Sequence, residues 1–191
     1  VGLDTLGHVI RTLTNYLPDD SWHPHYVIPA ALTALVEKGA LGQKSGAGFY
    51  RKQGKDILVL DIATGEYRAS GQPTSDEVNA ILKIKDAGER LGKLRDSNDP
   101  QAQFLWAIQR DLFHYAAVHL ADIADSAREV DFAMRWGYGW KQGPFESWQA
   151  AGWQQVATWI KEDIDAGKTM SAAALPDWVF DGRDGVHADA G

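Results

Sequence analysis

The first segment of this sequence that could carry chemistry is a glycine-rich stretch with one lysine. Residues 42–48 (GQKSGAG) have the composition of a phosphate-binding loop, and Lys44 is their only cation. The spacing fails, because a Walker loop needs Gly, four residues, Gly, and then Lys with Ser or Thr. The stretch also follows a predicted helix, whereas a phosphate loop follows a strand. We therefore interpret residues 42–48 as a structural loop.

A second glycine-rich stretch imitates a dinucleotide fingerprint. Residues 137–143 (GYGWKQG) have one residue too many before the last glycine, and the segment before them is again helical in pattern. A Rossmann turn needs a preceding strand, so that its amides face the pyrophosphate from a helix N-terminus. The sequence contains no βαβ pattern, and we predict that these residues bind neither nicotinamide nor flavin.

The histidines do not form a recognisable catalytic or metal-binding set. His23 and His25 flank Pro24 and could chelate a metal as an extended pair, but the spacing suggests no third ligand. His119 falls on an apolar helical stripe, which favours a core histidine over a general base. No Ser-His-Asp set can be nominated. The sequence therefore predicts no catalytic residue, no cofactor-binding residue and no metal site.

The composition is that of a globular protein with an acidic surface. The 191 residues are 45% hydrophobic and 24% charged, and 19 Lys and Arg against 26 Asp and Glu give a formal net charge of -7. This balance argues against nucleic-acid and anionic-membrane binding, both of which need clustered cations. No apolar run approaches the ~20 residues of a membrane span. The absence of cysteine fits a reducing compartment.

Hydrophobic periodicity predicts a mainly α-helical fold with one small β-hairpin. Apolar residues recur at helical spacing in residues 3–13 and 27–36, and Gly39 is placed to end the second helix. Residues 57–60 and a return strand from Tyr67 form the predicted hairpin. Further helices are expected over residues 74–88, 101–123, 126–136 and 153–164. The Gly- and Asp-rich tail from Gly182 is predicted to fray.

The longest predicted helix follows a polar linker at residues 95–100. We expect its buried face to be one apolar stripe, made of Phe104, Ile108, Leu112, Tyr115, His119 and Ile123. Capping boxes are predicted at Thr74 with Glu77 and at Ser126 with Glu129. The 8 Trp, six of them within residues 136–178, are interpreted as packing residues rather than as a base-stacking platform.

Residues 130–146 (VDFAMRWGYGWKQGPFE) resemble a stretch of the C-terminal domain of 3-hydroxyacyl-CoA dehydrogenases. In that family an Asp leads a short helix, a Gly-x-Gly turn and Gly-Pro-Phe-Glu follow, and a later Gly, here Gly152, opens the next helix. The first five residues resemble this last element in another copy, at an offset of 150. Residues 35–50 resemble the family's closing motif.

The resemblance implies two degenerate tandem repeats with a fold like the C-terminal domain of 6-phosphogluconate dehydrogenase. Residues 1–50 would be the latter part of the first repeat, residues 51–100 a hairpin-plus-helix insert or linker, and residues 101–191 the second repeat. For the Gly-Pro-Phe-Glu motif we expect Pro144 to fix φ, Gly143 to adopt unusual backbone angles and Phe145 to anchor the loop in the core.

The family's complete enzymes oxidise (3S)-3-hydroxyacyl-CoA with NAD in fatty acid β-oxidation. Their NAD fingerprint and catalytic His-Glu pair belong to an N-terminal Rossmann domain, which we predict to be missing from this chain, since it opens at Val1 without Met. The resemblance therefore implies a substrate-closing and assembly region that binds no cofactor and is inactive alone. An acyl-CoA substrate, an adjoining enoyl-CoA hydratase domain and a cytoplasmic location are also implied.

Two interpretations stay open. Lys44 is the one candidate substrate-binding residue, through a CoA phosphate, and the alternative is a solvated loop lysine. The whole region could also be a non-catalytic oligomerisation or scaffold module that uses the same helices without touching substrate.

Overall fold

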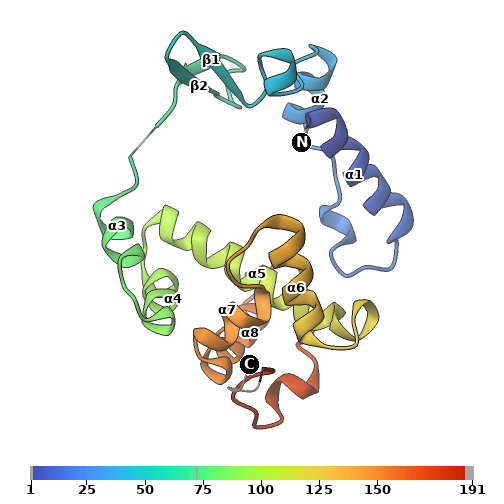
Figure 1. Cartoon of the computed structure of the whole chain (residues 1–191), viewed down its shortest axis with the longest axis vertical. Coiled ribbons are helices and arrows are strands. Elements are labelled where there is room, and N and C mark those ends of the chain that lie inside the picture. Colours follow the sequence, from blue (N-terminus) through green and yellow to red (C-terminus); the bar gives the residue numbers. More distant parts are fainter. Residues whose placement is uncertain (1, 72, 188–191) are drawn as a thin grey trace. The chain divides into compact units, whose positions relative to one another are not determined.

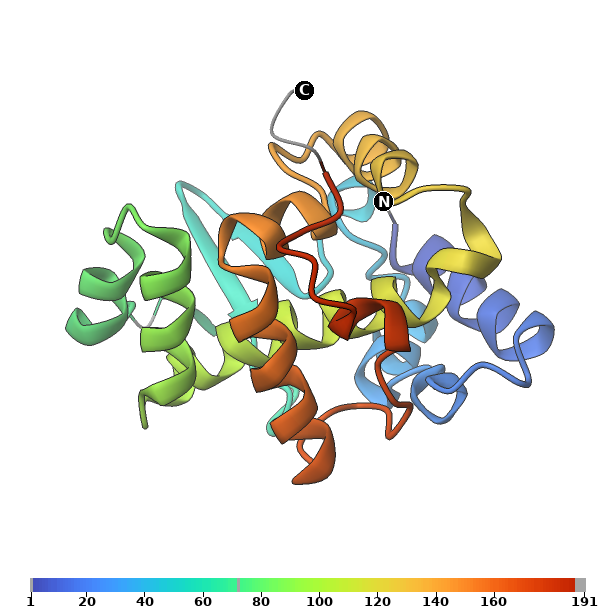
Figure 2. The ribbon, with the colours of Figure 1, turned by 90° about the horizontal axis from the view of Figure 1, so that it is seen from below.

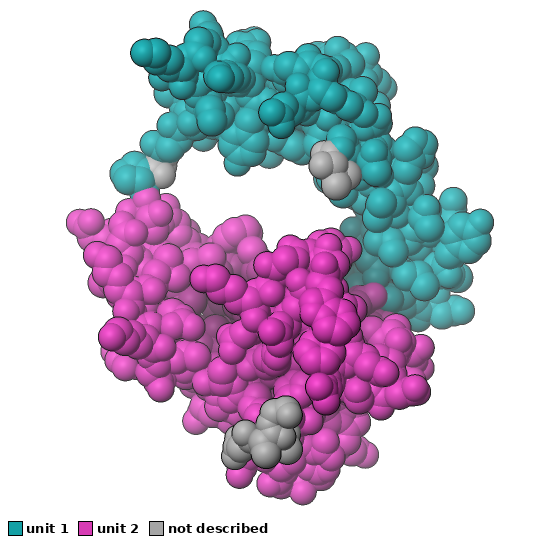
Figure 3. Space-filling model, in the orientation of Figure 1, with its two compact units in different colours: residues 1–73 teal, residues 74–191 magenta. Residues whose placement is uncertain are grey.

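The chain divides into two compact units, residues 1–73 and residues 74–191 (Figure 3). A computed structural model describes residues 2–71 and 73–187. The fold is mainly helical with a small antiparallel sheet, and this confirms the predicted fold class. None of the helices in these described ranges has the length and apolarity needed to cross a bilayer.

The first unit consists of two helices, two short 3-10 turns and a small sheet (Figure 1). Helix α1 (Leu3–Tyr16) packs on α2 (Ala30–Glu37), and the 3-10 turns are His23–His25 and Gln43–Ser45. Its buried large side chains are Trp22, Leu32 and Leu35. As predicted, a glycine ends α2: Gly39 follows the C-cap and has φ +71°, which suits glycine.

The predicted hairpin is part of a three-stranded antiparallel sheet. Strands β2 (Asp56–Leu60) and β3 (Tyr67–Ala69) pair as expected, with Leu60 opposite Tyr67. A further strand that the sequence analysis did not predict, β1 (Tyr50–Gln53), pairs with the other edge of β2. Its residues are all exposed, so they carry no alternation of buried and exposed positions from which a strand could be predicted.

The elements described in the second unit are all helical (Figures 1 and 2). This unit contains most of the buried apolar side chains. The helices are α3 (Asp76–Leu82), α4 (Ala87–Asp96), α5 (Pro100–Ile123), α6 (Ala127–Tyr138), α7 (Pro144–Ala150) and α8 (Trp153–Asp165), followed by the 3-10 turn Asp177–Phe180. Helix α5 contacts α4, α6 and α7. It is the central element of this unit.

The buried face of α5 is not the predicted stripe. Phe104, Ile108 and Ile123 are 64%, 47% and 61% exposed. The residues that α5 buries are Ala102, Trp106, Arg110, Phe113, His114, Ala116 and Ala117. This face was missed because it contains alanines and an arginine, and because a helix that is apolar on more than one side has an ambiguous periodicity.

Aromatic stacking forms the middle of the second unit. Trp148 stacks on Trp153 at 4.3 Å between ring centroids and on Phe113 at 5.6 Å. The Trp148 indole donates to the carbonyl of Trp153, and the Trp153 indole donates to the carbonyl of Val179. These tryptophans are packing residues, as predicted. Trp136, by contrast, is exposed.

Three predicted helix boundaries need correction. Ser75, not Thr74, is the N-cap of α3, and its hydroxyl accepts from the Val78 amide. The helix expected to run on to Gly88 ends at Leu82, and Asp86 caps a separate helix α4. Helix α6 ends at Tyr138, and its C-cap is Gly139 with φ +69°, rather than Gly137. The capping box of Ser126 with Glu129 is confirmed.

Candidate functional site

The motif at residues 130–146 folds as a clamp between α6 and α7. Asp131, fully buried on α6, accepts hydrogen bonds from the backbone amides of Phe145 (2.9 Å) and Glu146 (3.0 Å). The Gly143 amide donates to the Glu146 carboxylate at 2.8 Å, and Pro144 has no amide hydrogen. The amides that a helix N-terminus leaves unpaired are thus satisfied through the first turn of α7.

Gly143 is needed here because another residue comes close, and not because of its backbone angles. Its φ of -78° is ordinary, which corrects the expectation of unusual angles. A Cβ at this position would lie 2.2 Å from Asp131 Oδ1 and 2.3 Å from Asp131 Cα. Phe145 is fully buried, as the sequence predicted. The motif therefore requires glycine so that the buried carboxylate can reach the start of α7.

The structure brings His187 onto the same carboxylate. His187 Nε2 donates to Asp131 Oδ2 at 2.5 Å. The tail is held further by Gln149, whose Oε1 accepts from the amides of Val186 and His187, both at 2.9 Å. Residues 182–187, for which a frayed tail was expected, are thus docked at their end, and residues 188–191 lie outside the described residues. No spacing in the sequence indicates a pair separated by 56 residues.

The Asp131–His187 pair has the composition of a catalytic dyad but the connections of a structural one. Burial raises the pKa of Asp131, while hydrogen bonds from His187 and from the amides of Phe145 and Glu146 lower it. Both carboxylate oxygens already accept from α7 amides. The carboxylate thus fixes a helix start and a tail, and among the described residues we find no nucleophile placed beside it.

The glycine loop at residues 42–48 uses its polar groups internally. The Gly42 amide donates to the Ala47 carbonyl at 2.6 Å, and the Leu41 amide donates to Ser45 Oγ at 2.7 Å. A Cβ on Gly48 would lie 2.9 Å from Gly42 Cα, so the two ends of the loop touch. This supports the structural interpretation, because amides bonded within the loop are not directed at a phosphate.

Lys44 lies on this loop and pairs with a carboxylate of α1. Its Nζ is 2.7 Å from Asp4 Oδ2, and the lysine side chain is 55% exposed. The ion pair lowers the pKa of Asp4, first through the hydrogen bond from Lys44. An exposed pair of this kind contributes little to stability, because solvent screens it. Lys44 is therefore accessible, and its charge is shared with Asp4.

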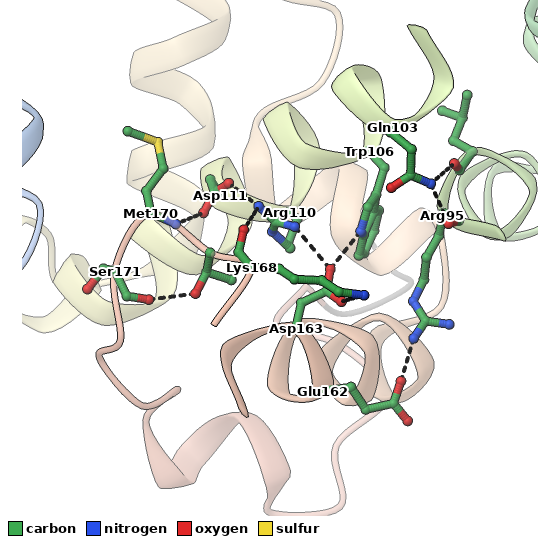
Figure 4. A network of polar contacts seen from close by, with 12 residues as sticks. Arg95, Gln103, Trp106, Arg110, Asp111, Glu162, Asp163, Lys168, Met170 and Ser171 are labelled. Atoms are coloured by element: carbon green, nitrogen blue, oxygen red, sulfur yellow. Dashed lines mark hydrogen bonds and ion pairs between the residues drawn. The ribbon is translucent and has the colours of Figure 1, made fainter. Parts of the chain in front are cut away.

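A buried ionic network joins α5 to α8, and the sequence analysis did not anticipate it (Figure 4). Asp163 Oδ2 accepts from Arg110 Nη1 at 3.0 Å and from the Trp106 indole at 2.8 Å. Arg110 Nη2 donates to Asp111 and to the Lys168 carbonyl, both at 2.7 Å. Asp111, whose side chain is 11% exposed, belongs to this network. The side chains of Arg110 and Asp163 are each only 6% exposed.

The core histidine of the second unit is His114, and not His119 as predicted. His114 is fully buried, and its Nε2 lies 2.7 Å from the Ala173 carbonyl. Burial lowers the pKa of His114. His119 is only partly buried, and its ring packs at a tilt against Tyr115 with 4.3 Å between ring centroids. Within residues 2–71 and 73–187, no three His, Asp or Glu side chains gather into a possible metal site.

Comparisons with known proteins connect this chain to one enzyme family. The chain is 36% identical over 178 residues, 87% of its length, to a Bacillus subtilis protein named as a 3-hydroxyacyl-CoA dehydrogenase. The chain belongs to the 3-hydroxyacyl-CoA dehydrogenase family. It is also 29% identical over 164 residues to a Rickettsia felis protein named as a trifunctional enzyme of a fatty acid oxidation complex. That match covers 82% of this chain.

A shorter stretch of the chain is similar to a further dehydrogenase. Over 50 residues, 26% of the chain and 16% of the relative, it is 44% identical to a 3-hydroxybutyryl-CoA dehydrogenase of Mycobacterium tuberculosis. No family model and no solved structure matches. The chain spans only about a fifth of the Bacillus and Rickettsia relatives, 22% and 21% of their lengths. What those longer proteins do is therefore a proposal for this chain.

The nicotinamide cofactor of such dehydrogenases does not fit either glycine loop of this chain. The loop at residues 42–48 follows α2, and the loop at residues 137–143 overlaps the end of α6, so neither follows a strand. Gly143 donates its amide to Glu146. The only sheet in the described residues is antiparallel, which excludes a Rossmann turn from this part of the chain.

Proposed function

We propose that this chain is the C-terminal substrate-closing and assembly region of an NAD-dependent (3S)-3-hydroxyacyl-CoA dehydrogenase of fatty acid β-oxidation. The observation that carries the proposal is the Asp131 clamp. The motif by which the sequence resembles the family's C-terminal domain forms one compact capping arrangement. The identity to the Bacillus relative over 87% of the chain supports the same assignment.

In this proposal, nicotinamide binding and proton abstraction take place in another part of a longer protein. A Rossmann domain supplies NAD and the catalytic base, and an enoyl-CoA hydratase domain adjoins it. The name of the Rickettsia relative, a trifunctional enzyme, supports a multidomain parent. The residues of this chain then close over the acyl group and hold the domains together, and none of them acts on the reacting atoms.

Lys44 remains the proposed contact to a CoA phosphate. Its ammonium is exposed, and its partner Asp4 is also partly accessible, so a phosphate can compete with the carboxylate. Replacing Lys44 by Gln in the full-length enzyme is expected to raise the KM for acyl-CoA several-fold with little change in kcat. Lys38→Gln, an exposed lysine at the end of α2, is the matched control. Equal KM values for the two variants would contradict this role.

One observation favours the alternative of a non-catalytic oligomerisation or scaffold module. The polar groups of the 42–48 loop bond within that loop, and those of the 131–146 clamp bond within the clamp. Such loops stabilise a scaffold without any ligand. In this alternative the helices assemble the protein and never contact substrate.

An experiment on the full-length product of the gene distinguishes the substrate-closing region from the scaffold module. We expect that product to oxidise (3S)-3-hydroxybutyryl-CoA with NAD, and we expect acetoacetyl-CoA with NADH to slow amide hydrogen exchange within the segment corresponding to residues 1–191. NADH alone is the control for effects of the cofactor. Turnover without protection in this segment would favour the scaffold module. Absence of NAD-dependent turnover would overturn the dehydrogenase assignment.

A further inference from the structure

The second unit contains an apolar pocket that the clamp and the ionic network do not use. It has a volume of about 240 Å³ and is walled mainly by α4, α5 and α7, with Leu82 contributed by the end of α3 and Gln142 by the loop before α7. Helices α4, α5 and α7 contact one another pairwise. Eight of its twelve lining residues are apolar. The pocket lies within one compact unit, so its walls are positioned by a single core.

The walls of the pocket are firm and its mouth is apolar. Leu91, Leu94 and Phe113 are buried, and Phe113 stacks on Trp148. At the mouth, Leu82 and Ile108 are 49% and 47% exposed. Exposed apolar side chains that line a pocket with a buried apolar floor are typical of a ligand site. Covering such a groove with an apolar ligand is favourable, because it removes apolar surface from water.

One cation lies among these apolar residues. Arg90 lines the pocket, and its Nη1 donates to the carbonyls of Ile84 (2.7 Å) and Lys85 (3.4 Å) in the connection between α3 and α4. Within the described residues, no carboxylate forms an ion pair with Arg90. Its positive charge is therefore available to a ligand whose apolar part fills the pocket and whose polar end is an acceptor or an anion.

We propose that this pocket binds the acyl chain of a medium-chain acyl-CoA, with Arg90 beside the thioester end. The choice of an acyl group rests on the proposed function. The volume supports a chain rather than a whole coenzyme, since a cavity of about 150 Å³ holds benzene and drug-sized ligands need about 300 Å³ or more. The CoA moiety stays outside the pocket.

The first test uses the 191-residue chain and a series of butyryl-, hexanoyl- and octanoyl-CoA, titrated by calorimetry. Each methylene buried in the pocket is expected to raise affinity about fourfold, so octanoyl-CoA binds roughly 200-fold more tightly than butyryl-CoA. Octanoyl-CoA is also expected to shift the backbone amide resonances of Leu91, Leu94 and Phe113. Affinity independent of chain length, or shifts confined to other residues, would overturn the proposal.

Two substitutions on one helix provide a matched pair. Ile108→Trp fills the mouth of the pocket and is expected to weaken octanoyl-CoA binding at least tenfold. Phe104→Trp, one turn away on α5 and 64% exposed, does not line the pocket and is expected to leave affinity unchanged. Unaltered thermal unfolding shows that each variant folds. Equal affinities of the two variants would contradict the pocket.

The role of Arg90 is tested with a second pair of variants and with octanoate and octanol as ligands. Arg90→Gln is expected to weaken octanoate binding more than octanol binding, while Lys93→Gln, also on α4 but outside the pocket, weakens neither. If octanoyl-CoA did not bind while the full-length protein turned over substrate, the proposed acyl-binding pocket would be refuted and the proposed function would stand. Binding without any NAD-dependent turnover of the full-length protein would refute the proposed function and leave the pocket standing.

Discussion

Helices α1 and α8 are built alike and packed differently. Each starts after a glycine N-cap, Gly2 or Gly152, and each has an apolar face along 13 or 14 residues. Helix α8 buries Trp153, Val156, Ala157, Ile160 and Asp163. Helix α1 buries only Gly7. The same sequence pattern thus makes a core element in one unit and a largely exposed amphipathic helix in the other.

This difference shows where the stability of the chain resides. Helices of about 12–15 residues are marginal in water unless an apolar face is packed, and a small unit buries little surface. The first unit has three large buried side chains, Trp22, Leu32 and Leu35, whereas the second has a continuous core around Trp106, Trp148 and Trp153. We infer that the second unit sets the free energy of unfolding and that α1 opens more readily.

The largest expected effect comes from truncating the core of the second unit. Trp153→Ala removes a fully packed indole and its bond to Val179, and should lower the free energy of unfolding by about 3–5 kcal/mol. Val9→Ala on the exposed face of α1 should change it by less than about 0.5 kcal/mol. Urea unfolding followed by circular dichroism measures both. Similar losses at the two positions would refute the contrast between the units.

The buried ionic network should respond nearly as strongly. Asp163→Asn removes the carboxylate that faces Arg110 Nη1 and leaves Asp111 as the carboxylate paired with the buried guanidinium, which is expected to cost about 3 kcal/mol. Asp165→Asn, two residues along α8, removes only the exposed pair with Lys161 and should cost about 0.3–0.5 kcal/mol. The double variant Arg110→Met/Asp163→Leu should recover only part of the loss, because it leaves Asp111 without its partner Arg110. If Asp163→Asn were as mild as Asp165→Asn, the network would contribute nothing.

Replacing either of two glycines near the clamp by alanine should change the stability in opposite directions. Gly143→Ala places a Cβ against Asp131 and should destabilise by about 1–3 kcal/mol. Gly137 lies inside α6 with no atom near the position of a Cβ, so Gly137→Ala should stabilise by about 0.5–1 kcal/mol through helix propensity. Thermal unfolding of the pair checks this, and a stabilising Gly143→Ala would show that the clamp tolerates a side chain.

The smallest expected effect is the pH dependence of stability that His114 contributes. Burial lowers the pKa of His114 below its ordinary value of 6.5, so the unfolded chain binds this proton first as pH falls. The histidine's contribution is complete above pH 6.5 and decreases below it. The raised pKa of Asp131 acts in the opposite direction, at pH values above 3.8. His114→Gln should flatten the dependence of stability on pH below 6.5, as measured by urea unfolding at a series of pH values.

The existence of the helices was predictable from the sequence, while their buried faces and partners were not. Periodicity identified α5, but its buried stripe includes Arg110, whose burial depends on Asp163, 53 residues away. No local pattern reports such a partner. The clamp was predictable only as a family motif: the sequence indicated Phe145 as an anchor, whereas the approach of Asp131 to Gly143 and the docking of His187 are tertiary contacts.

The central claim is that both units serve packing and enclosure, without a nicotinamide site or catalytic base of their own. A fluorescence titration of the 191-residue chain with NADH, paired with a turnover assay on 3-hydroxybutyryl-CoA, tests it most directly. We predict no saturable binding of NADH and no oxidation above background, because neither glycine loop follows a strand and general-base catalysis alone is worth about 10²–10⁴-fold in rate. Micromolar NADH binding or measurable turnover by this chain would contradict the claim.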